Sequence, residues 1–223
     1  MNNKNLIIGY HGCDADVAMQ LLLGEKRMHW SKSVYEWLGH GMYFWENNLK
    51  RAREWADKKE RVGHIRKPTV IGAILDLQYC FDLSGKHHLD LLRSYYLEYR
   101  DDIVSRGGKL LVNSAPKGTN PRDRVCRQLD CAVIEYMHDD LRKLAALGFS
   151  ETNLCLTKPF DSMRGVFVEG EPVFEGSDIY CDTHIQICIR NPDCIVGFFL
   201  PREGEEGIRR LEGREDPAEY LYH

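Results

Sequence analysis

The stretch IIGYHGCDAD, residues 7–16, changes character at its centre. Its first half is an apolar run typical of a buried strand, and Asp14 is a suitable N-cap for a helix that ends near Gly24. His11 and Gly12 stand between the two halves. A histidine at a strand end can hold a ligand hydroxyl, and a glycine lets a ligand approach the backbone closely. The alternative is a surface histidine that merely precedes a helix.

A second stretch, GHGMYFWEN at residues 39–47, has two glycines before three consecutive aromatic side chains. Three aromatics in a row cannot all face one core. In a strand, Tyr43 and Trp45 share one face and Phe44 takes the other. One face is then core, and the other offers a flat aromatic surface to a planar ligand. An ordinary strand with a single exposed aromatic residue is the alternative.

Outside these two stretches, apolar patterning predicts strands towards both ends of the chain with helices between them. The strand of the first stretch is expected at 5–10, and the strands outside the two stretches are expected at 68–84, 164–170, 183–190 and 194–201. The expected helices begin at Asp14, at Asn47 or Asn48, at residue 88 and near Val125. The segment 191–193 favours a hairpin turn between the last two strands. Because strands and helices do not alternate, the pattern is not that of a doubly wound parallel sheet, and it predicts an α+β fold.

The bulk composition is that of a globular protein. The chain has 223 residues, of which 43% are apolar and 29% charged, enough for one sizeable core. We expect a single domain over residues 1–203 and a charged tail at 204–223. No apolar run approaches the roughly 20 residues that span a bilayer, and the N-terminus does not have the long apolar segment of a secretory signal. These features predict a cytoplasmic protein.

The cysteines and charged residues give little indication of a bound metal ion or nucleotide. None of the eight cysteines forms a CxxC pair, and most lie in apolar runs, so we expect structural thiols and no metal. The net charge is −4, but residues 50–67 carry eight basic side chains interleaved with acidic ones. This segment is either a solvated helix face or a phosphate-binding stripe. The motifs GxGxxG and GxxxxGK[ST] are absent, which excludes nucleotide binding by those loops.

Taken together, YHG at residues 10–12 and LGHGMYFWENNLKRAREWA at residues 38–56 resemble the NAD-binding core of the ADP-ribosyltransferase fold. The similarity is to the diphtheria-toxin and poly(ADP-ribose) polymerase branch. Its members carry a His-Gly on the first strand, then Gly-x-Tyr-Phe, and then a helix with a further aromatic residue. The resemblance is strong over residues 6–57, moderate over 164–200 and weak between them. It implies a split β-sheet core with flanking helices.

The resemblance also implies a role for each matched residue. His11 would bind ribose hydroxyls of NAD, and the backbone of Gly12 would hold the nicotinamide carboxamide. Tyr43 would stack on the nicotinamide ring with Trp55 closing the other side, and Phe44 belongs to the same NAD-binding motif. Such a clamp suits a reaction that builds positive charge on the ribose, because the substrate must be oriented and the developing cation stabilised.

One residue departs from the family pattern. Members carry a glutamate on a late strand, which binds the ribose 2′-hydroxyl and stabilises the cation, and the resemblance puts Gln186 at that position. Glutamine can bind a hydroxyl but brings no negative charge. The loop before this strand offers Glu169 as the first alternative and Glu171 as the next, although either is equally a solvated loop acid. Glu46 is a third candidate, better suited to the electrostatics of a helix end.

The resemblance implies a mono-ADP-ribosyltransferase that uses NAD as substrate, needs no metal, and releases nicotinamide. It further suggests an intracellular toxin of a toxin–antitoxin or phage-defence system, opposed by an antitoxin protein. The acceptor is a nucleic acid or a protein, and the basic segment slightly favours nucleic acid. Two other classes stay open. An NAD glycohydrolase would release free ADP-ribose, and an inactive module would bind NAD or an ADP-ribosylated partner without releasing nicotinamide.

Overall fold

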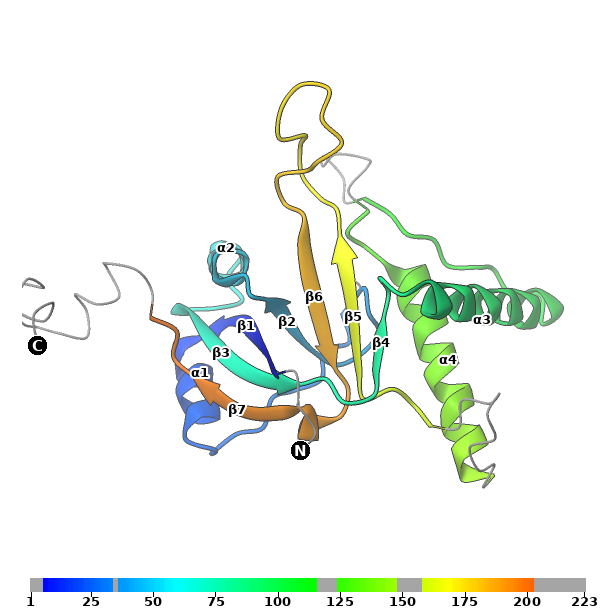
Figure 1. Ribbon diagram of the computed structural model, residues 1–223, viewed down its shortest axis with the longest axis horizontal. Coiled ribbons are helices and arrows are strands. Elements are labelled where there is room, and N and C mark those ends of the chain that lie inside the picture. Colours follow the sequence, from blue (N-terminus) through cyan, green and yellow to red (C-terminus); the bar gives the residue numbers. More distant parts are fainter. Residues whose placement is uncertain (1–5, 34–35, 116–123, 148–157, 203–223) are drawn as a thin grey trace, which may run out of the picture.

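The computed structural model describes residues 6–33, 36–115, 124–147 and 158–202. These residues form one sheet of seven strands in the order β4-β5-β6-β2-β1-β3-β7 (Figure 1). The strands are β1 (Leu6–Asp14), β2 (Met42–Glu46), β3 (Pro68–Asp76), β4 (Cys80–Asp82), β5 (Ser162–Phe167), β6 (His184–Ile189) and β7 (Ile195–Phe199). The helices are α1 (Ala15–Leu22), α2 (Leu49–Arg61), α3 (Lys86–Ser105) and α4 (Gln128–Ala146). The predicted α+β class is therefore confirmed. The expected tail at 204–223 lies outside the described residues.

Helices cover both faces of the sheet. Residues directly opposite in antiparallel strands point to the same face, so the strand registers assign each core cluster to one side of the sheet. Helix α2 packs over Trp45 and Val70 on one face, and α3 and α4 cover Met163 and Cys188 on that same face. Helix α1 packs against Ile71 on the opposite face. The face shared by α2, α3 and α4 is called the α2 face below.

Local sequence signals place the helix starts correctly. The side chain of Asp14 accepts a hydrogen bond from the Asp16 amide and caps α1. Asn48 caps α2 in the same way by accepting from the Arg51 amide. Each cap satisfies a backbone N–H that the first helical turn leaves without a partner. Both capping predictions are confirmed, with Asn48 rather than Asn47 as the cap of α2.

Two predicted strand features are wrong. The single strand expected at 68–84 is two strands, because the chain turns at Gln78, which has a φ of 48°. The turn at 191–193 does not make a hairpin. There Asn191 caps a short 3-10 turn, and β7 pairs with β3 at the far edge of the sheet instead of with β6.

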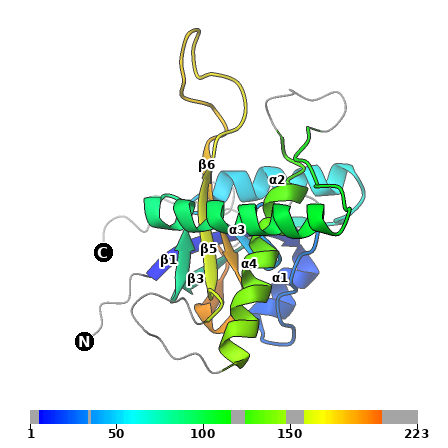
Figure 2. The same ribbon diagram turned by 90° about the vertical axis from the view of Figure 1, so that its right-hand side faces the viewer.

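The chain between β5 and β6 projects well beyond the sheet, as both views show (Figures 1 and 2). This β5–β6 hairpin (residues 168–183) is held by its own backbone hydrogen bonds, including Val173 N to Ile179 O and Asp182 N to Glu169 O. Large apolar side chains at its tip are exposed, Phe174 to 65%. The hairpin is therefore an ordered projection whose tip makes little contact with the core.

Candidate functional site

The sheet splits between β1 and β2. The two strands are in register only at Tyr10 with Trp45 and at the residue pair beside it. Beyond that point β1 continues along β3 to Asp14, and β2 continues along β6. The prediction that a strand ends at His11 is thus wrong on the β3 side, because the β1–β3 ladder runs on. On the β2 side the pairing does stop at Tyr10, so His11 is the first residue past the split.

His11 bridges the split. Its Nδ1 lies 2.7 Å from the carbonyl oxygen of Tyr43. Because a carbonyl oxygen only accepts, Nδ1 carries the proton and Nε2 is left as the acceptor of the ring. Burial lowers the pKa of His11, and the nearby charge of Lys59 lowers it further. The imidazole is therefore neutral near pH 7, and it can accept a hydrogen bond from a ligand hydroxyl through Nε2.

Gly12 lies buried beneath α2. A Cβ atom at this position would come within 2.3 Å of the Ala52 carbonyl oxygen and 3.1 Å of the Ala56 side chain. A side chain here would push the helix off the sheet. We expected a ligand to approach the backbone of Gly12 closely. Helix α2 makes that close approach instead.

The three aromatics of β2 alternate as predicted. Phe44 is fully buried on the face opposite α2, whereas Tyr43 and Trp45 point to the α2 face. The prediction of an open aromatic surface is wrong, because α2 covers Trp45 and leaves it 7% exposed. Trp55 of α2 lies against Trp45, with ring centroids 5.9 Å apart. In the described residues its ring neighbour is thus Trp45 and not Tyr43.

The hydroxyl of Tyr43 is fixed by the loop that precedes β2. It donates to the carbonyl oxygen of Gly39 at 2.6 Å and accepts from the amide of Leu38 at 2.8 Å. Burial raises the pKa of Tyr43, so the phenol stays protonated. The tyrosine therefore fixes the loop to the strand, and only its partly buried ring is left to contact a ligand.

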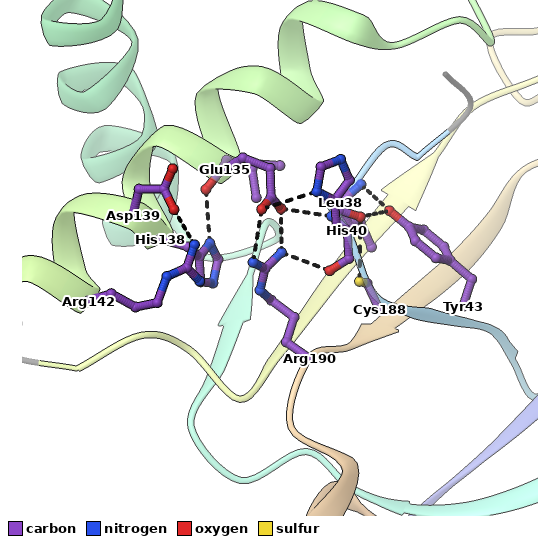
Figure 3. A network of polar contacts seen from close by, with 11 residues as sticks. Leu38, His40, Tyr43, Glu135, His138, Asp139, Arg142, Cys188 and Arg190 are labelled. Atoms are coloured by element: carbon purple, nitrogen blue, oxygen red, sulfur yellow. Dashed lines mark hydrogen bonds and ion pairs between the residues drawn. The ribbon is translucent and has the colours of Figure 1, made fainter. Parts of the chain in front are cut away.

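That loop is held from the other side by a buried charge pair, which no local sequence pattern indicates (Figure 3). Glu135 of α4 accepts from the Nη1 of Arg190 at 2.6 Å and from the His40 amide at 2.7 Å. Burial alone would raise the pKa of the Glu135 carboxyl, but the hydrogen bonds and charge of Arg190 hold it below its ordinary value. Arg190 Nη1 also donates to the His40 carbonyl at 2.9 Å. These contacts join α4, the end of β6 and the loop before Tyr43.

Gln186 lies on the α2 face. It is opposite Trp45 of β2 and opposite Gly165 of β5. Tyr10, Trp45 and Gln186 therefore form a row across the split region of the sheet. His11 is on the opposite face by alternation, with its ring 5.9 Å from that of Phe44. The structure thus brings His11 to the Tyr43 backbone, while Gln186 stands beside Trp45.

The three candidate acids have different environments. Glu46 forms an ion pair with Arg164 at 2.6 Å, which in turn pairs with Asp82, so its carboxylate belongs to a ladder across β2, β5 and β4. Glu171 lies exposed further along the hairpin. Glu169 lies at the base of the hairpin with a side chain only 12% exposed, 3.3 Å from Arg51 of α2. Of the three, Glu169 is the one that faces α2 and β6.

The basic segment at 50–67 is the exposed side of α2 and the turn after it. Lys58 and Lys59 lie over the Trp55 ring, with Nζ atoms 5.7 and 5.2 Å from its centroid. Arg51 is directed instead toward carboxylates of the hairpin. The segment therefore has an exposed cationic side, and one of its arginines, Arg51, pairs with carboxylates of the protein itself.

The chain also has a pocket of about 340 Å³ between α3, α4 and β5, and neither His11 nor Tyr43 lines it. Trp37 and Phe167 line it, and the Arg127 guanidinium lies 4.6 Å from the Trp37 ring centroid. Arg127 pairs with Asp130 at 3.3 Å. Since this pocket contains none of the motif residues, it is not part of the candidate site.

No protein-family model, curated protein or solved structure matches the chain. In the four described ranges, no group of three or more His, Cys, Asp or Glu side chains is arranged to hold a metal ion. The seven cysteines in these ranges are free thiols. None of the described helices combines the length and apolar character required to cross a membrane.

Proposed function

We propose that this chain is a mono-ADP-ribosyltransferase that transfers ADP-ribose from NAD to a macromolecule and releases nicotinamide. The observation that carries the proposal is the contact between His11 Nδ1 and the Tyr43 carbonyl across the split sheet. These two residues belong to the two stretches that resemble the family, and 32 positions separate them. A neutral histidine whose Nε2 can accept a hydrogen bond, placed at such a split, suits the binding of a ribose hydroxyl.

The proposed reaction breaks the bond between ribose C1′ and nicotinamide. The electron pair of that bond leaves with nicotinamide, which becomes neutral, and C1′ then bonds to the acceptor. Positive charge develops on the ribose before the acceptor attacks, so a nearby carboxylate lowers the barrier. In this proposal NAD spans the split between β1 and β2, so that His11 orients the ribose from one face and the Tyr43 ring borders the nicotinamide on the α2 face.

The biological setting follows only from the family resemblance. We propose an intracellular toxin of a toxin–antitoxin or phage-defence system, held in check by an antitoxin protein. The acceptor is a macromolecule, and the exposed basic side of α2 favours nucleic acid because phosphate contacts supply most non-specific affinity. This side carries Lys50, Lys58 and Arg61, and the segment after the helix adds Arg66 and Lys67.

A second candidate function rests on Gln186. A carboxamide replaces the expected carboxylate on the α2 face, and Trp45 beside it is covered by α2. Such a site favours binding over catalysis. On this reading the chain binds NAD, or a partner that carries ADP-ribose, and releases no nicotinamide.

Nicotinamide release from labelled NAD tests the proposal, with and without cellular RNA, DNA and protein. His11→Asn retains an N–H donor for the Tyr43 carbonyl and removes the acceptor nitrogen. We expect it to fold and to lower nicotinamide release by at least about 100-fold. The exposed His29 provides the matched control, and His29→Asn should leave release unchanged.

The location of the label distinguishes the alternatives. Label in one macromolecular fraction, lost in His11→Asn, supports transfer and identifies the acceptor class. Release without labelled macromolecule indicates a glycohydrolase. Bound NAD with no release rejects the transferase and supports the binding module.

A further inference from the structure

Strand β5 is longer than the strand beside it at its edge of the sheet. Strand β4 pairs with β5 only at Ser162–Arg164, so Gly165–Phe167 has no partner strand on that side among the described residues (Figure 1). Leu83 N donates to Arg164 O at 2.8 Å, so the backbone groups of Arg164 face β4. Successive residues of a strand direct their N–H and C=O groups to alternate sides. Those of Val166 therefore point to the same edge, beyond the end of β4.

This edge is open and apolar. Within the described ranges, no backbone hydrogen bond outside the sheet ladders involves Val166. The segment 165–168 (GVFV) has no charged residue and no proline, and Val166 and Val168 are 50% and 55% exposed. Proteins usually guard a free edge with charges, proline or a bulge, because an open edge is a template for pairing with another chain. The second half of β5 therefore suits the binding of a further strand.

The pocket of about 340 Å³ lies directly beside this edge. It is lined by residues 166–168 and by apolar side chains of other elements: Trp37, Leu89, Leu92 and Ile134. Its volume lies within the range of about 300–1,000 Å³ that ligand sites have. Side chains alternate between the two faces of a strand. A strand added to β5 would thus direct every second side chain into the pocket and the others toward Val166 and Val168.

The charges beside the pocket favour an acidic partner. Arg127 lines the pocket, and its ion pair in the described ranges is with Asp130 at 3.3 Å, while its Nε has no hydrogen-bond partner there. Asp130 is already bound, because it accepts from Asn113 Nδ2 at 2.6 Å. The exposed Arg93 lies one helical turn after Leu89 on the same side of α3. Two arginines and one bound aspartate therefore border the pocket.

We propose that the open edge of β5 and the pocket beside it, called the β5 groove below, bind an extended acidic peptide segment of a partner protein. The segment pairs with the backbone of Val166 in the place that β4 leaves free. Its apolar side chains enter the pocket, and one carboxylate binds Arg127. Backbone hydrogen bonds supply affinity in strand addition of this kind, and the pocket supplies specificity. The inference does not rest on the proposed function, since neither His11 nor Tyr43 lines the pocket.

The test begins with a library of random peptides, displayed on phage and selected on the full chain. The most enriched peptide is synthesised, and its Kd is measured by fluorescence anisotropy. Leu89→Glu places a charge in the β5 groove, and Leu97→Glu places one outside the pocket on the same helix as a matched control. The two leucines are 45% and 41% exposed, so both variants should fold. We expect Leu89→Glu to raise Kd at least about tenfold and Leu97→Glu to change it less than about twofold.

The contact with Arg127 is tested by a double-mutant cycle. Replacing the acidic residue of the peptide by its amide should raise Kd at least about fivefold with the unchanged chain. With Arg127→Gln the same replacement should change Kd less than about twofold, because the partner of the carboxylate is gone. Equal effects in the two chains would show that the carboxylate does not bind Arg127.

Amide hydrogen exchange measured by NMR tests the added strand. Bound peptide should slow exchange of the Val166 amide at least about tenfold, because the amide then donates to the peptide backbone. The amide of Val196, in β7 at the opposite edge of the sheet, should keep its rate. Slower exchange at Val166 alone supports the proposal, and peptide binding that leaves it unchanged overturns the added strand.

The other occupants of the β5 groove give different results. A synthetic peptide of residues 203–223 that binds the groove as tightly as the selected peptide would assign it to the chain itself. A dimer in sedimentation equilibrium that Leu89→Glu dissociates would assign it to a second copy. Either result overturns the proposal, and so does a library that yields no peptide sensitive to Leu89→Glu.

Discussion

The two ends of strand β6 each lie beside an arginine–glutamate pair, and the two arginines differ in how completely their own polar atoms are paired. The buried Nε2 of His138, near Arg190, also has no partner among the described residues. At the end of the strand, Arg190 is 5% exposed and is bound by Glu135 and the His40 carbonyl. At its start, Glu169 contacts Arg51, yet His184 Nε2 and Arg51 Nε have no partner in the described part of the chain. A satisfied buried network fixes one packing arrangement, whereas an unsatisfied one costs stability unless a ligand completes it. We therefore interpret the first end as structural and propose a function for the second.

The largest expected effect is at the Glu135–Arg190 pair. Glu135→Ala leaves the Arg190 charge buried without its partner, and we expect the free energy of unfolding to fall by about 3–5 kcal/mol. Urea denaturation at pH 7 measures the loss. Asp139→Ala on the exposed side of α4 is the control, with an expected change below about 0.5 kcal/mol. A loss of similar size in both variants would contradict the structural role.

A smaller effect comes from His138, which lies near Arg190. Burial lowers its pKa to about 4, with the Arg190 charge adding to the shift. The unfolded chain therefore binds a proton below about pH 6.5 that the folded chain does not accept until about pH 4. From this group alone, the free energy of unfolding should fall by about 2–3 kcal/mol between pH 7 and 4.5.

Urea denaturation at pH 7 and 4.5 measures this dependence. His138→Leu should flatten it by that amount, whereas His87→Leu on the exposed side of α3 should not. Equal pH dependence in the unchanged chain and in His138→Leu would show that other groups dominate acid unfolding.

The smallest expected effect on stability is at the other end of β6. Glu169→Gln should change the free energy of unfolding by less than about 1 kcal/mol, because Arg51 is partly exposed and keeps Glu54 and Asp182 as partners. The same urea titrations measure it. A loss as large as that of Glu135→Ala would make the Glu169 pair structural and remove the contrast between the two ends.

Much of the fold is predictable because its signals are local. The caps at Asp14 and Asn48, the amphipathic period of α4 and the alternation of Tyr43, Phe44 and Trp45 each depend on residues a few positions apart. The pairing of β7 with β3 was missed because a turn signal shows only that the chain reverses. Which strand it then joins depends on where apolar side chains can be buried.

The features of the candidate site also differ in whether neighbouring residues in the sequence could indicate them. The sequence patterns drew attention to His11, Gly12 and Tyr43 beside apolar runs, and the family resemblance then added Gln186 and Glu169 as candidates. Neither indicated the Glu135–Arg190 pair or the Arg51–Glu169 contact, whose partners are 55 and 118 positions apart. Hydrogen bonds and ion pairs act over a few ångströms. Only the packing of α2 and α4 against the sheet decided which of these side chains come within that distance.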